Sequence, residues 1–399
     1  MKKVLIIGGG YAGVSALREL AKSEDIEVTL IDRHPYHFLQ TEGYELVANT
    51  IPFDKTIVNL HTLCESFGEN VSFLHDAVKE IDLTKKRVIC EDSEELSYDY
   101  LIVAAGSVTK FFKSIEGLEN CGHGVKSLTG AFKLKQFFEK ELFLRLESPL
   151  SAKNHYSVLV AGAGLSGVEI AAQMQYYFNR YYKSNTLACK SLKIHLVSGS
   201  KNILKHMHPK TIRKARKRLV DLGVIMHEGS HIKKVEKERA VLENSEEIVF
   251  DFMIFTGGIM ASPLIDTIKT QKNKLGQIIP RPTLQLQEKK EVFAAGDAAE
   301  LRDITGNLLP PTAHVAMQSG KTAAKNIKLL LDDQEPAFAH MSQEGIAIAL
   351  GGKYAILDMK SFRFSGYWAY LAKKTIEKVY KWPLWLKCAT VSRNICKKL

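Results

Sequence analysis

The apolar residues of this chain follow one pattern twice. Residues 4–7 form a short apolar run that ends at a glycine cluster, and residues 158–161 form a second run that ends in the same way. After each cluster, apolar residues recur every three or four positions, as they do along the buried face of a helix. Each repeat therefore predicts a strand, a tight turn and a helix. Each also carries a later buried strand, at 96–107 and 248–258, that ends in small residues.

The spacing of the glycines indicates what the first turn binds. Gly8, Gly10 and Gly13 form GxGxxG, which permits the tight turn, lets a pyrophosphate approach the backbone and lets the helix pack on the strand. Free amides at the helix start attract the phosphates. Asp32, about 20 residues farther on, ends the next apolar run, where a carboxylate holds a ribose hydroxyl. We expect dinucleotide contacts at Gly8, Gly10, Tyr11, Ala12, Gly13, Asp32 and Arg33.

A second glycine cluster repeats this spacing and predicts a second dinucleotide site. Gly162, Gly164 and Gly167 open the helix that carries Leu165 and Glu169. Two nucleotide sites imply two cofactors, one retained and one that comes and goes. The expected contacts in this half, together with the small residues that end the later strands, are Ala105, Gly106, Gly162, Gly164, Leu165, Gly167, Glu169, Gly257 and Gly258.

Composition and charge narrow the protein class. The 399 residues carry a net charge of +11 and suit two or three globular domains. The positive charge favours an anionic partner, and we expect phosphate-bearing cofactors and lipid headgroups rather than nucleic acid. No apolar run approaches the roughly 18 residues of a membrane-spanning helix. The cysteines lack a CxxC pair and metal-ligand spacing, which indicates a reduced cytosolic setting without a metal site; they are Cys64, Cys90, Cys121, Cys189, Cys388 and Cys396.

In these elements the chain resembles the two-dinucleotide-fold flavoproteins, in which an NAD(P)H domain interrupts an FAD domain. EVFAAGDAA at 291–299 is similar to the segment where the FAD domain resumes, and the resemblance places Gly296 and Asp297 at FAD. From the residues alone, Asp297 could equally be a helix N-cap. The resemblance implies an α/β fold with two Rossmann-like domains: FAD-binding at 1–118 and 279–345, NAD(P)H-binding at 119–278, and a C-terminal membrane-association region at 346–399.

The nicotinamide donor is expected to be NADH, with NADPH as the alternative. Related proteins usually have a carboxylate at the end of the second strand of this domain, whereas this chain has Ser198 with Lys201 close by. Serine discriminates less between a ribose diol and a ribose phosphate. The basic run at 205–218 could attract a phosphate, but it also fits a solvated helix face.

The segment after Asp297 resembles type II NADH:quinone oxidoreductase. Residues 309–327 carry Ala313, Ala316 and Gln318 where that family has AQxAxQ, the helix that brings the quinone ring to the flavin. His314 stands where glutamine is usual. The resemblance implies roles in quinone binding for Ala313, His314 and Gln318. The alternative is a helix that only packs on the flavin, as in reductases with other acceptors.

Glu169 lies in GVExA, a segment that in the same family lies near the nicotinamide and quinone pockets. We expect it to help protonate the quinone, although a carboxylate in a first helical turn is also stabilised by the helix dipole alone. Sulfide:quinone oxidoreductases resemble the chain in outline. They replace the second glycine cluster with a cysteine-bearing turn, whereas this chain keeps the glycines, which favours a nicotinamide donor.

The C-terminal segment is aromatic and basic. Trp368, Trp382 and Trp385 all fall in it, and Pro383 is expected to interrupt its helix. Such a segment lies flat at a bilayer interface, with rings at the acyl boundary and lysines near anionic headgroups. The alternative is a helix packed on the body or on a dimer partner. Its basic residues are Lys373, Lys374, Lys378, Lys381, Lys387, Arg393, Lys397 and Lys398, against the single acid Glu377.

Taken together, the sequence predicts a non-proton-pumping NADH:quinone oxidoreductase of the respiratory chain. It would pass a hydride from NADH to FAD and then two electrons to a membrane quinone, at the cytoplasmic face of the cell membrane. The expected catalytic residues are Glu169, His314 and Gln318. The alternatives are a flavin reductase of a soluble acceptor, a sulfide:quinone oxidoreductase and a redox-sensing membrane flavoprotein; a homodimer is left open.

Overall fold

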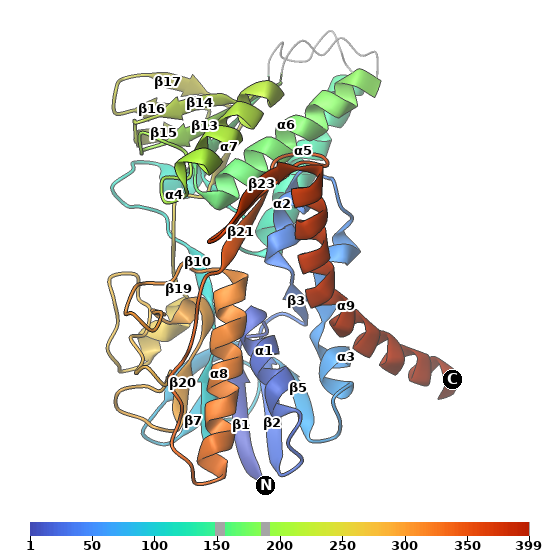
Figure 1. Cartoon of the computed structure of the whole chain (residues 1–399), viewed down its shortest axis with the longest axis vertical. Helices are drawn as coiled ribbons and strands as arrows, with labels where there is room; N and C mark the ends of the chain where they lie inside the picture. The colour runs from blue at the N-terminus through green and yellow to red at the C-terminus, as the bar shows by residue number, and fades with distance from the viewer. Residues whose placement is uncertain (148–155, 185–191, 399) are drawn as a thin grey trace.

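The computed structural model describes residues 1–147, 156–184 and 192–398. Two α/β units follow one another along the long axis, and the C-terminal helix α9 (Tyr367–Lys398) runs beside them (Figure 1). The predicted fold class, with two Rossmann-like folds, is confirmed, because each unit is built on a five-stranded parallel sheet.

The first sheet combines strands from both ends of the chain. Its order is β20-β9-β1-β2-β5, and every neighbouring pair is parallel. The fifth strand to join, β20, comes almost 190 residues after β9, so the first unit is completed only after the second has been built. The bounds are β1 (Lys2–Ile7), β2 (Ile26–Asp32), β5 (Val71–His75), β9 (Tyr100–Val103) and β20 (Val292–Ala294).

The second sheet has the same plan. Its order is β11-β18-β12-β13-β14, again all parallel, so that β18-β12-β13 corresponds to β9-β1-β2. The helices around it are α5 (Leu128–Glu147), α6 (Leu165–Ser184) and α7 (Pro209–Leu222). The strands are β11 (His123–Gly124), β12 (Tyr156–Ala161), β13 (Leu192–Ser198), β14 (Ile225–Glu228) and β18 (Phe252–Phe255).

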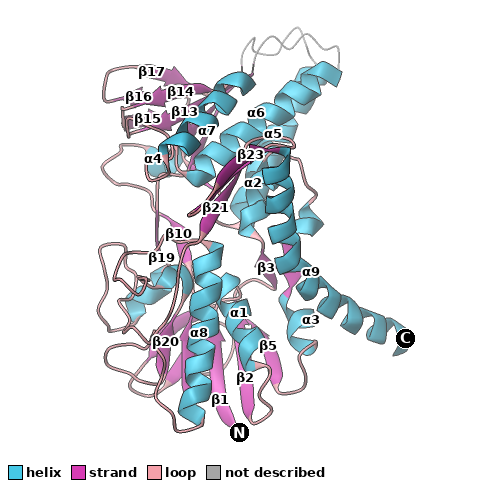
Figure 2. Ribbon diagram, in the orientation of Figure 1, coloured by secondary structure: helices cyan, strands magenta, loops and turns pink. Residues whose placement is uncertain are grey.

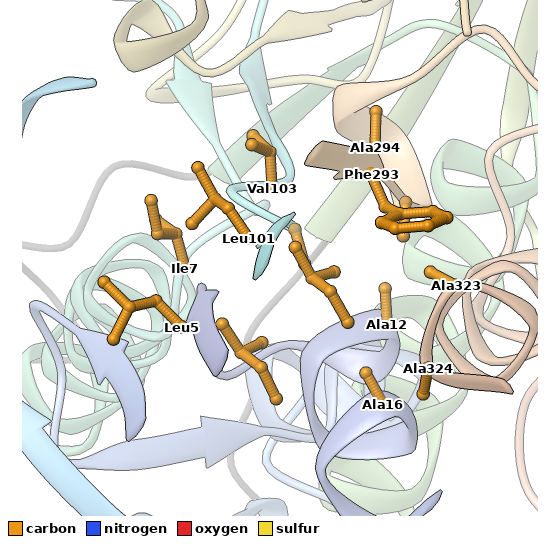
Figure 3. Close-up of a cluster of buried hydrophobic side chains, with 14 of the residues drawn as sticks. Leu5, Ile7, Ala12, Ala16, Leu101, Val103, Phe293, Ala294, Ala323 and Ala324 are labelled. Atoms are coloured by element: carbon orange, nitrogen blue, oxygen red, sulfur yellow. The ribbon is translucent and has the colours of Figure 1, made fainter. Parts of the chain in front are cut away.

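Helices α1 (Tyr11–Leu20) and α8 (Ala313–Leu331) pack closely over the first sheet. Figure 3 shows alanines where the two helices meet, with larger side chains from β1, β9 and β20 beneath them. A Cβ on Gly320 would lie 2.0 Å from the carbonyl oxygen of Ala12, so the contact requires glycine there. The segment that resumes the first unit therefore supplies both a strand and a covering helix.

Smaller antiparallel sheets and short helices fill the connections (Figure 2). The sheet of β21 (Gly345–Ala349), β22 (Ala355–Met359) and β23 (Arg363–Gly366) leads directly into α9. The others are β3 (Tyr36–Phe38) with β4 (Ile57–Asn59); β6 (Val78–Asp82) with β7 (Arg87–Cys90) and β8 (Leu96–Ser97); β10 (Ser107–Thr109) with β19 (Ile259–Ala261); and β15 (Ile232–Glu236) with β16 (Arg239–Leu242) and β17 (Glu247–Val249). The short helices are α2 (Gly43–Val47), α3 (Leu60–Glu65) and α4 (Leu118–Cys121).

Helix α9 is longer than the sequence pattern predicted. Pro383 lies inside it and does not end it, so the expected interruption is wrong. A proline inside a helix removes one backbone hydrogen bond and bends the helix rather than necessarily stopping it. Figure 1 shows α9 changing direction between its upper half, which lies along the body, and its lower half, which leads away toward the C-terminus.

Among the described residues, no helix combines the length and apolar character needed to cross a bilayer. Cys64, Cys90 and Cys121 are free thiols, and no disulfide links any two of the described cysteines. The described part of the chain also holds no group of three or more metal-ligating side chains arranged for an ion. Cys189 lies outside the described residues, as do the side chains of Arg393, Cys396, Lys397 and Lys398.

Candidate active site

A cavity of about 1100 Å³ opens at the carboxyl ends of the first sheet's strands. Doubly wound folds bind ligands at this edge. The lining comes from the first glycine turn, the ends of β2 and β9, the start of α8, the start of α6 and one face of α9. The cavity thus lies between the two units and α9, and it exceeds the size of a typical drug-sized pocket.

The first glycine turn has the backbone form that a dinucleotide requires. Gly8 has φ +106°, and a Cβ there would lie 2.3 Å from the carbonyl oxygen of Ala104. A Cβ on Gly13 would lie 1.8 Å from the carbonyl oxygen of Gly8, whereas one on Gly10 would meet nothing within 4 Å. Gly10 is the N-cap of α1 and makes no side-chain cap, so the first amides of the helix are left for a ligand.

Asp32 stands at the end of β2, as expected. Its carboxylate accepts hydrogen bonds from the backbone amides of Gly9 (2.6 Å) and His34 (2.8 Å) and lines the cavity. An acid held against the glycine turn, next to open backbone amides, is the arrangement that binds a ribose and its pyrophosphate. These residues fit an FAD adenosine diphosphate.

Asp297 lies on the far wall of the same cavity. It belongs to the 3-10 helix η4 (Gly296–Ala298), whose N-cap is Ala295, so the N-cap alternative for Asp297 is not what the structure has. Its carboxylate accepts hydrogen bonds from Ser107 Oγ and Lys126 Nζ, both at 2.7 Å. All three side chains line the cavity, and Lys126 was not predicted from the sequence.

Glu169 of α6 reaches the cavity from the second unit. Its buried carboxylate accepts a hydrogen bond from the Ala349 amide at 2.7 Å and lies 3.6 Å from Lys373 Nζ of α9. Burial raises the pKa of Glu169 above its usual range, although Lys373 opposes the shift. Burial alone would lower the pKa of Lys373, but Glu169 and Glu377 outweigh it and raise that pKa. Lys373 therefore stays charged, between two carboxylates.

Two further lysines on the face of α9 that points to the cavity also form ion pairs with buried carboxylates. Lys374 pairs with Glu45 of α2 at 2.7 Å, and Lys381 Nζ lies 2.6 and 2.8 Å from the carboxylate oxygens of Glu42. Glu42 and Glu45 are buried. Burial raises the pKa of Glu42, against the effect of Lys381. Because each carboxylate loses its water, these pairs fix the helix in one position.

A chain of hydrogen bonds links α9 to the first glycine turn. The Tyr380 hydroxyl and His37 Nε2 are 2.9 Å apart, and His37 Nδ1 is 2.9 Å from the carbonyl oxygen of Gly9. Burial lowers the pKa of His37 to about 4, so the ring is neutral near pH 7. A neutral ring that donates from Nδ1 to the carbonyl accepts the tyrosine proton at Nε2. Tyr11 packs against both rings.

The structure brings most of the predicted residues of the first half to this cavity, together with Glu169 and the start of α8. The lining includes Gly8, Gly10, Tyr11, Ala12, Asp32, Arg33, Ala105, Gly106, Leu165, Glu169, Gly296, Asp297, Ala313 and His314. Gly13 lies behind the turn, at its contact with Gly8.

The second glycine turn lies at the adjoining sheet and outside the cavity lining. Gly162 has φ +117°, and a Cβ on Gly167 would lie 1.8 Å from the carbonyl oxygen of Gly162, which reproduces the geometry of the first turn. Gly164, like Gly10, faces open space. Thr256 Oγ1 donates to the carbonyl oxygen of Gly162 at 2.8 Å, just before Gly257 and Gly258. A second dinucleotide cradle is therefore present.

Gln318 departs from the expected position. Its side-chain amide donates to the carbonyl oxygen of Ser342 at 2.8 Å and accepts from the Ser342 amide at 2.9 Å. It is not in the cavity lining, because the side chain braces the segment that leads to β21. In this structure Gln318 therefore supports that segment, its expected contact with a quinone stays a prediction, and His314 is exposed and lines this wall of the cavity.

Comparison with known proteins places the chain among redox flavoproteins. The family model described as pyridine nucleotide-disulphide oxidoreductase matches residues 2–320. The type II NADH:quinone oxidoreductase of Staphylococcus aureus (strain NCTC 8325 / PS 47) is 26% identical over 384 residues, covering 94% of each chain.

Solved structures share the fold over nearly the whole chain. NDH2 from Plasmodium falciparum in complex with NADH has a TM-score of 0.86 at 17% identity and covers 98% of this chain and 97% of its own. The sulfide:quinone oxidoreductase of Aquifex aeolicus has a TM-score of 0.80 at 18% identity, with 97% and 92% covered. At these identities the likeness is one of fold.

Replacing Lys373 with methionine should lower the free energy of unfolding by about 3–5 kcal/mol, because it leaves the buried Glu169 carboxylate without a cation and Glu377 with Lys374 alone. Chemical unfolding of the purified protein measures the change. Lys378→Met alters an exposed lysine of the same helix and should leave stability nearly unchanged. Equal losses in the two variants would contradict the buried ion-pair interpretation.

Proposed function

The chain belongs to the pyridine nucleotide-disulphide oxidoreductase family, and we propose that it is an FAD-dependent NADH:quinone oxidoreductase. NADH would be the hydride donor and a membrane quinone the final acceptor. One observation carries the proposal. The helix that opens from the second glycine turn, α6, delivers Glu169 into the cavity that the first glycine turn lines.

FAD would be held by the first turn, with Asp32 at its ribose and Asp297, Ser107 and Lys126 near the rest of the molecule. The flavin, when bound, supplies the centre that accepts a hydride and passes on electrons. The protein's part is to orient the two cofactors, exclude water and handle protons. A split FAD-binding unit is supported by β20, which pairs with β9 of the first sheet, and by α8, which packs over that sheet.

The acceptor side of the cavity would be formed by α8, β21 and α9. Ala313 and Met317 lie along α8, Ile346 and Ala347 along β21, and Ile376 on α9. These small or apolar side chains suit a flat, hydrophobic ring. His314, beside them, offers a hydrogen bond to a carbonyl oxygen in place of Gln318.

Glu169 and Lys373 are the residues that we propose for proton delivery. A quinone reduced by two electrons must gain two protons. A buried carboxyl whose pKa is raised holds a proton closer to neutral pH than an exposed one does. The adjacent Lys373 ammonium, which forms ion pairs with both Glu169 and Glu377, would keep that proton within the cluster.

A sulfide donor is the main enzymatic alternative, since the Aquifex aeolicus sulfide:quinone oxidoreductase shares the fold. That chemistry works through cysteines beside the flavin. No cysteine among the described residues lines the cavity, and the second glycine turn is intact. These two observations favour the nicotinamide donor.

Helix α9 would also attach the protein to the membrane. The helix exposes six large side chains, of which Ile376 also borders the cavity. Lys373, Lys374 and Lys381 were expected to meet lipid headgroups but instead point into ion pairs. Lys378 and Lys387 remain exposed. A row of exposed aromatic and aliphatic residues beside lysines is typical of an interfacial helix. The six residues are Tyr367, Trp368, Ile376, Val379, Trp382 and Leu386.

The function is tested on the purified yellow protein. Under anaerobic conditions NADH should bleach the flavin absorbance, and a short-chain quinone should restore it at a rate that supports steady-state turnover. Bleaching by sulfide but not by NADH would favour the sulfide alternative. Bleaching by NADH without reoxidation by quinone would indicate another acceptor or a redox sensor.

The pH dependence of Glu169→Gln tests the proton role. A donor works only in its protonated form, so the quinone-dependent kcat should fall as pH rises through the raised pKa of Glu169. The variant should lose that pH limb and about 100-fold of kcat. NADH oxidation with ferricyanide, which takes up no proton, should stay near wild type. An unchanged pH profile with quinone would exclude Glu169 as the donor.

Removing the exposed rings tests the membrane role. Truncation before α9 is unsuitable, because Lys373, Glu377 and Tyr380 line the cavity. The triple variant Trp368→Ser, Val379→Ser, Trp382→Ser should instead release the protein from anionic vesicles in a flotation assay while it keeps its flavin. Ile304→Ser and Leu308→Ser, at exposed positions away from α9, serve as a control. Wild-type vesicle binding by the triple variant would rule out this face.

A further inference from the structure

Comparing the two glycine turns identifies which residue of the second unit occupies the position that contacts the adenosine ribose in the first. In the first unit the amide of Gly8 donates to the carbonyl oxygen of Ile31 at 2.8 Å, and Asp32 is the next residue. In the second unit the amide of Gly162 donates to that of Val197 at 3.0 Å, and Ser198 is the next residue. The strand registers agree, with Ile7 opposite Ile31 and Ala161 opposite Val197. Ser198 is thus the structural counterpart of Asp32.

The two positions differ in charge and in what they bond. The Asp32 carboxylate reaches across to the amide of Gly9 in its turn. Ser198 is buried, and its hydroxyl donates to the carbonyl oxygen of Ser200 at 3.0 Å and lies 3.3 Å from the Ser200 amide. The hydroxyl is used within its own loop. The strand end in the second unit therefore presents no negative charge.

A carboxylate on the neighbouring strand does not replace the missing one. Glu228 lies opposite Ser198 on β14. Its two oxygens accept from Arg216 at 2.5 and 2.9 Å and from the Ile203 amide at 2.8 Å. Arg216 comes from α7, in the basic run that the sequence left ambiguous, and neutralises the glutamate. Lys201, in the same loop, is exposed.

The end of β13 therefore carries no net negative charge, and this bears on whether the site selects NADH or NADPH. A carboxylate at this position accepts hydrogen bonds from a ribose diol and repels a 2′-phosphate, whereas a nearby cation accommodates the phosphate. Ser198 removes the repulsion and Lys201 adds an attraction. Building on the proposed function, we propose that the chain accepts NADPH as well as NADH, with Ser198 and Lys201 as the residues that set this dual specificity.

Binding of adenosine fragments tests this without flavin chemistry. On the purified holoprotein, calorimetry should show that 2′,5′-ADP binds at least as tightly as AMP at low ionic strength, and that salt weakens 2′,5′-ADP more than AMP. NADPH and NADH should then bleach the flavin with apparent Kd values within about tenfold of each other. NADPH binding more than about 100-fold weaker than NADH binding would overturn the proposal.

Variants assign the effect to the two residues. Lys201→Glu, at an exposed position, should weaken 2′,5′-ADP and NADPH by about 100-fold and leave AMP and NADH nearly unchanged. Ser198→Glu should give the same discrimination, whereas Lys237→Glu, the matched control at an exposed lysine of the β15–β16 turn, should leave the binding of all four nucleotides unchanged. If Lys201→Glu weakened AMP and 2′,5′-ADP equally, the proposed role of Lys201 would be wrong.

The outcome is separable from that of the proposed function. If both nucleotides bleach the flavin but quinone does not restore its absorbance, the quinone proposal fails and dual specificity stands. If only NADH bleaches it and quinone restores it, the reverse holds.

Discussion

The arrangement of the molecule around its cavity depends on three lysine ammonium groups that α9 inserts between carboxylates. Lys373, Lys374 and Lys381 are taken largely out of water, which is unfavourable unless each finds an anion. Their partners lie on separate elements: Glu42 and Glu45 before and within α2, and Glu169 on α6. Since the pairs are lost together if the helix shifts, α9 has one low-energy position. That position closes the cavity and brings elements of both units to it.

One face of α9 points to the cavity, and the opposite face is exposed. The inward face carries the lysines and Tyr380, which joins the first glycine turn through His37. The outward face carries Trp368, Val379 and Trp382, all more than half exposed. Because the inward residues are fixed by buried pairs, the outward row has a defined orientation relative to the cavity. In the proposed function, a quinone dissolved in the bilayer would enter beside the helix that touches the lipid.

Local backbone chemistry made the two nucleotide folds predictable from sequence. Glycine spacing after an apolar strand determines the turn by itself, and the structure has the predicted close packing of the helix at Gly13 and Gly167. The partner of Glu169 was not predictable in this way. Lys373 lies 204 positions later, and a lysine on an amphipathic helix gives no local sign that it faces a buried acid. Gln318 fits the expected motif, but its side-chain amide forms hydrogen bonds with the backbone of Ser342. Only tertiary packing determines that contact. The one signal in the sequence for these buried ion pairs was a helical spacing that places four charged residues on one face, namely Lys373, Lys374, Glu377 and Lys381.

The difference between the two halves explains how one duplicated turn can serve two purposes. In the first half, the glycine turn lies under α9 and beside α8, and Asp32 bonds back to it, so a bound dinucleotide would be enclosed on several sides. In the second half, the turn lies outside that cavity, and its strand end carries a neutral serine bound to its own loop. In the proposed function, the flavin retained in the enclosed cavity and the nicotinamide nucleotide exchanging at the second turn would use the same glycine geometry in different surroundings.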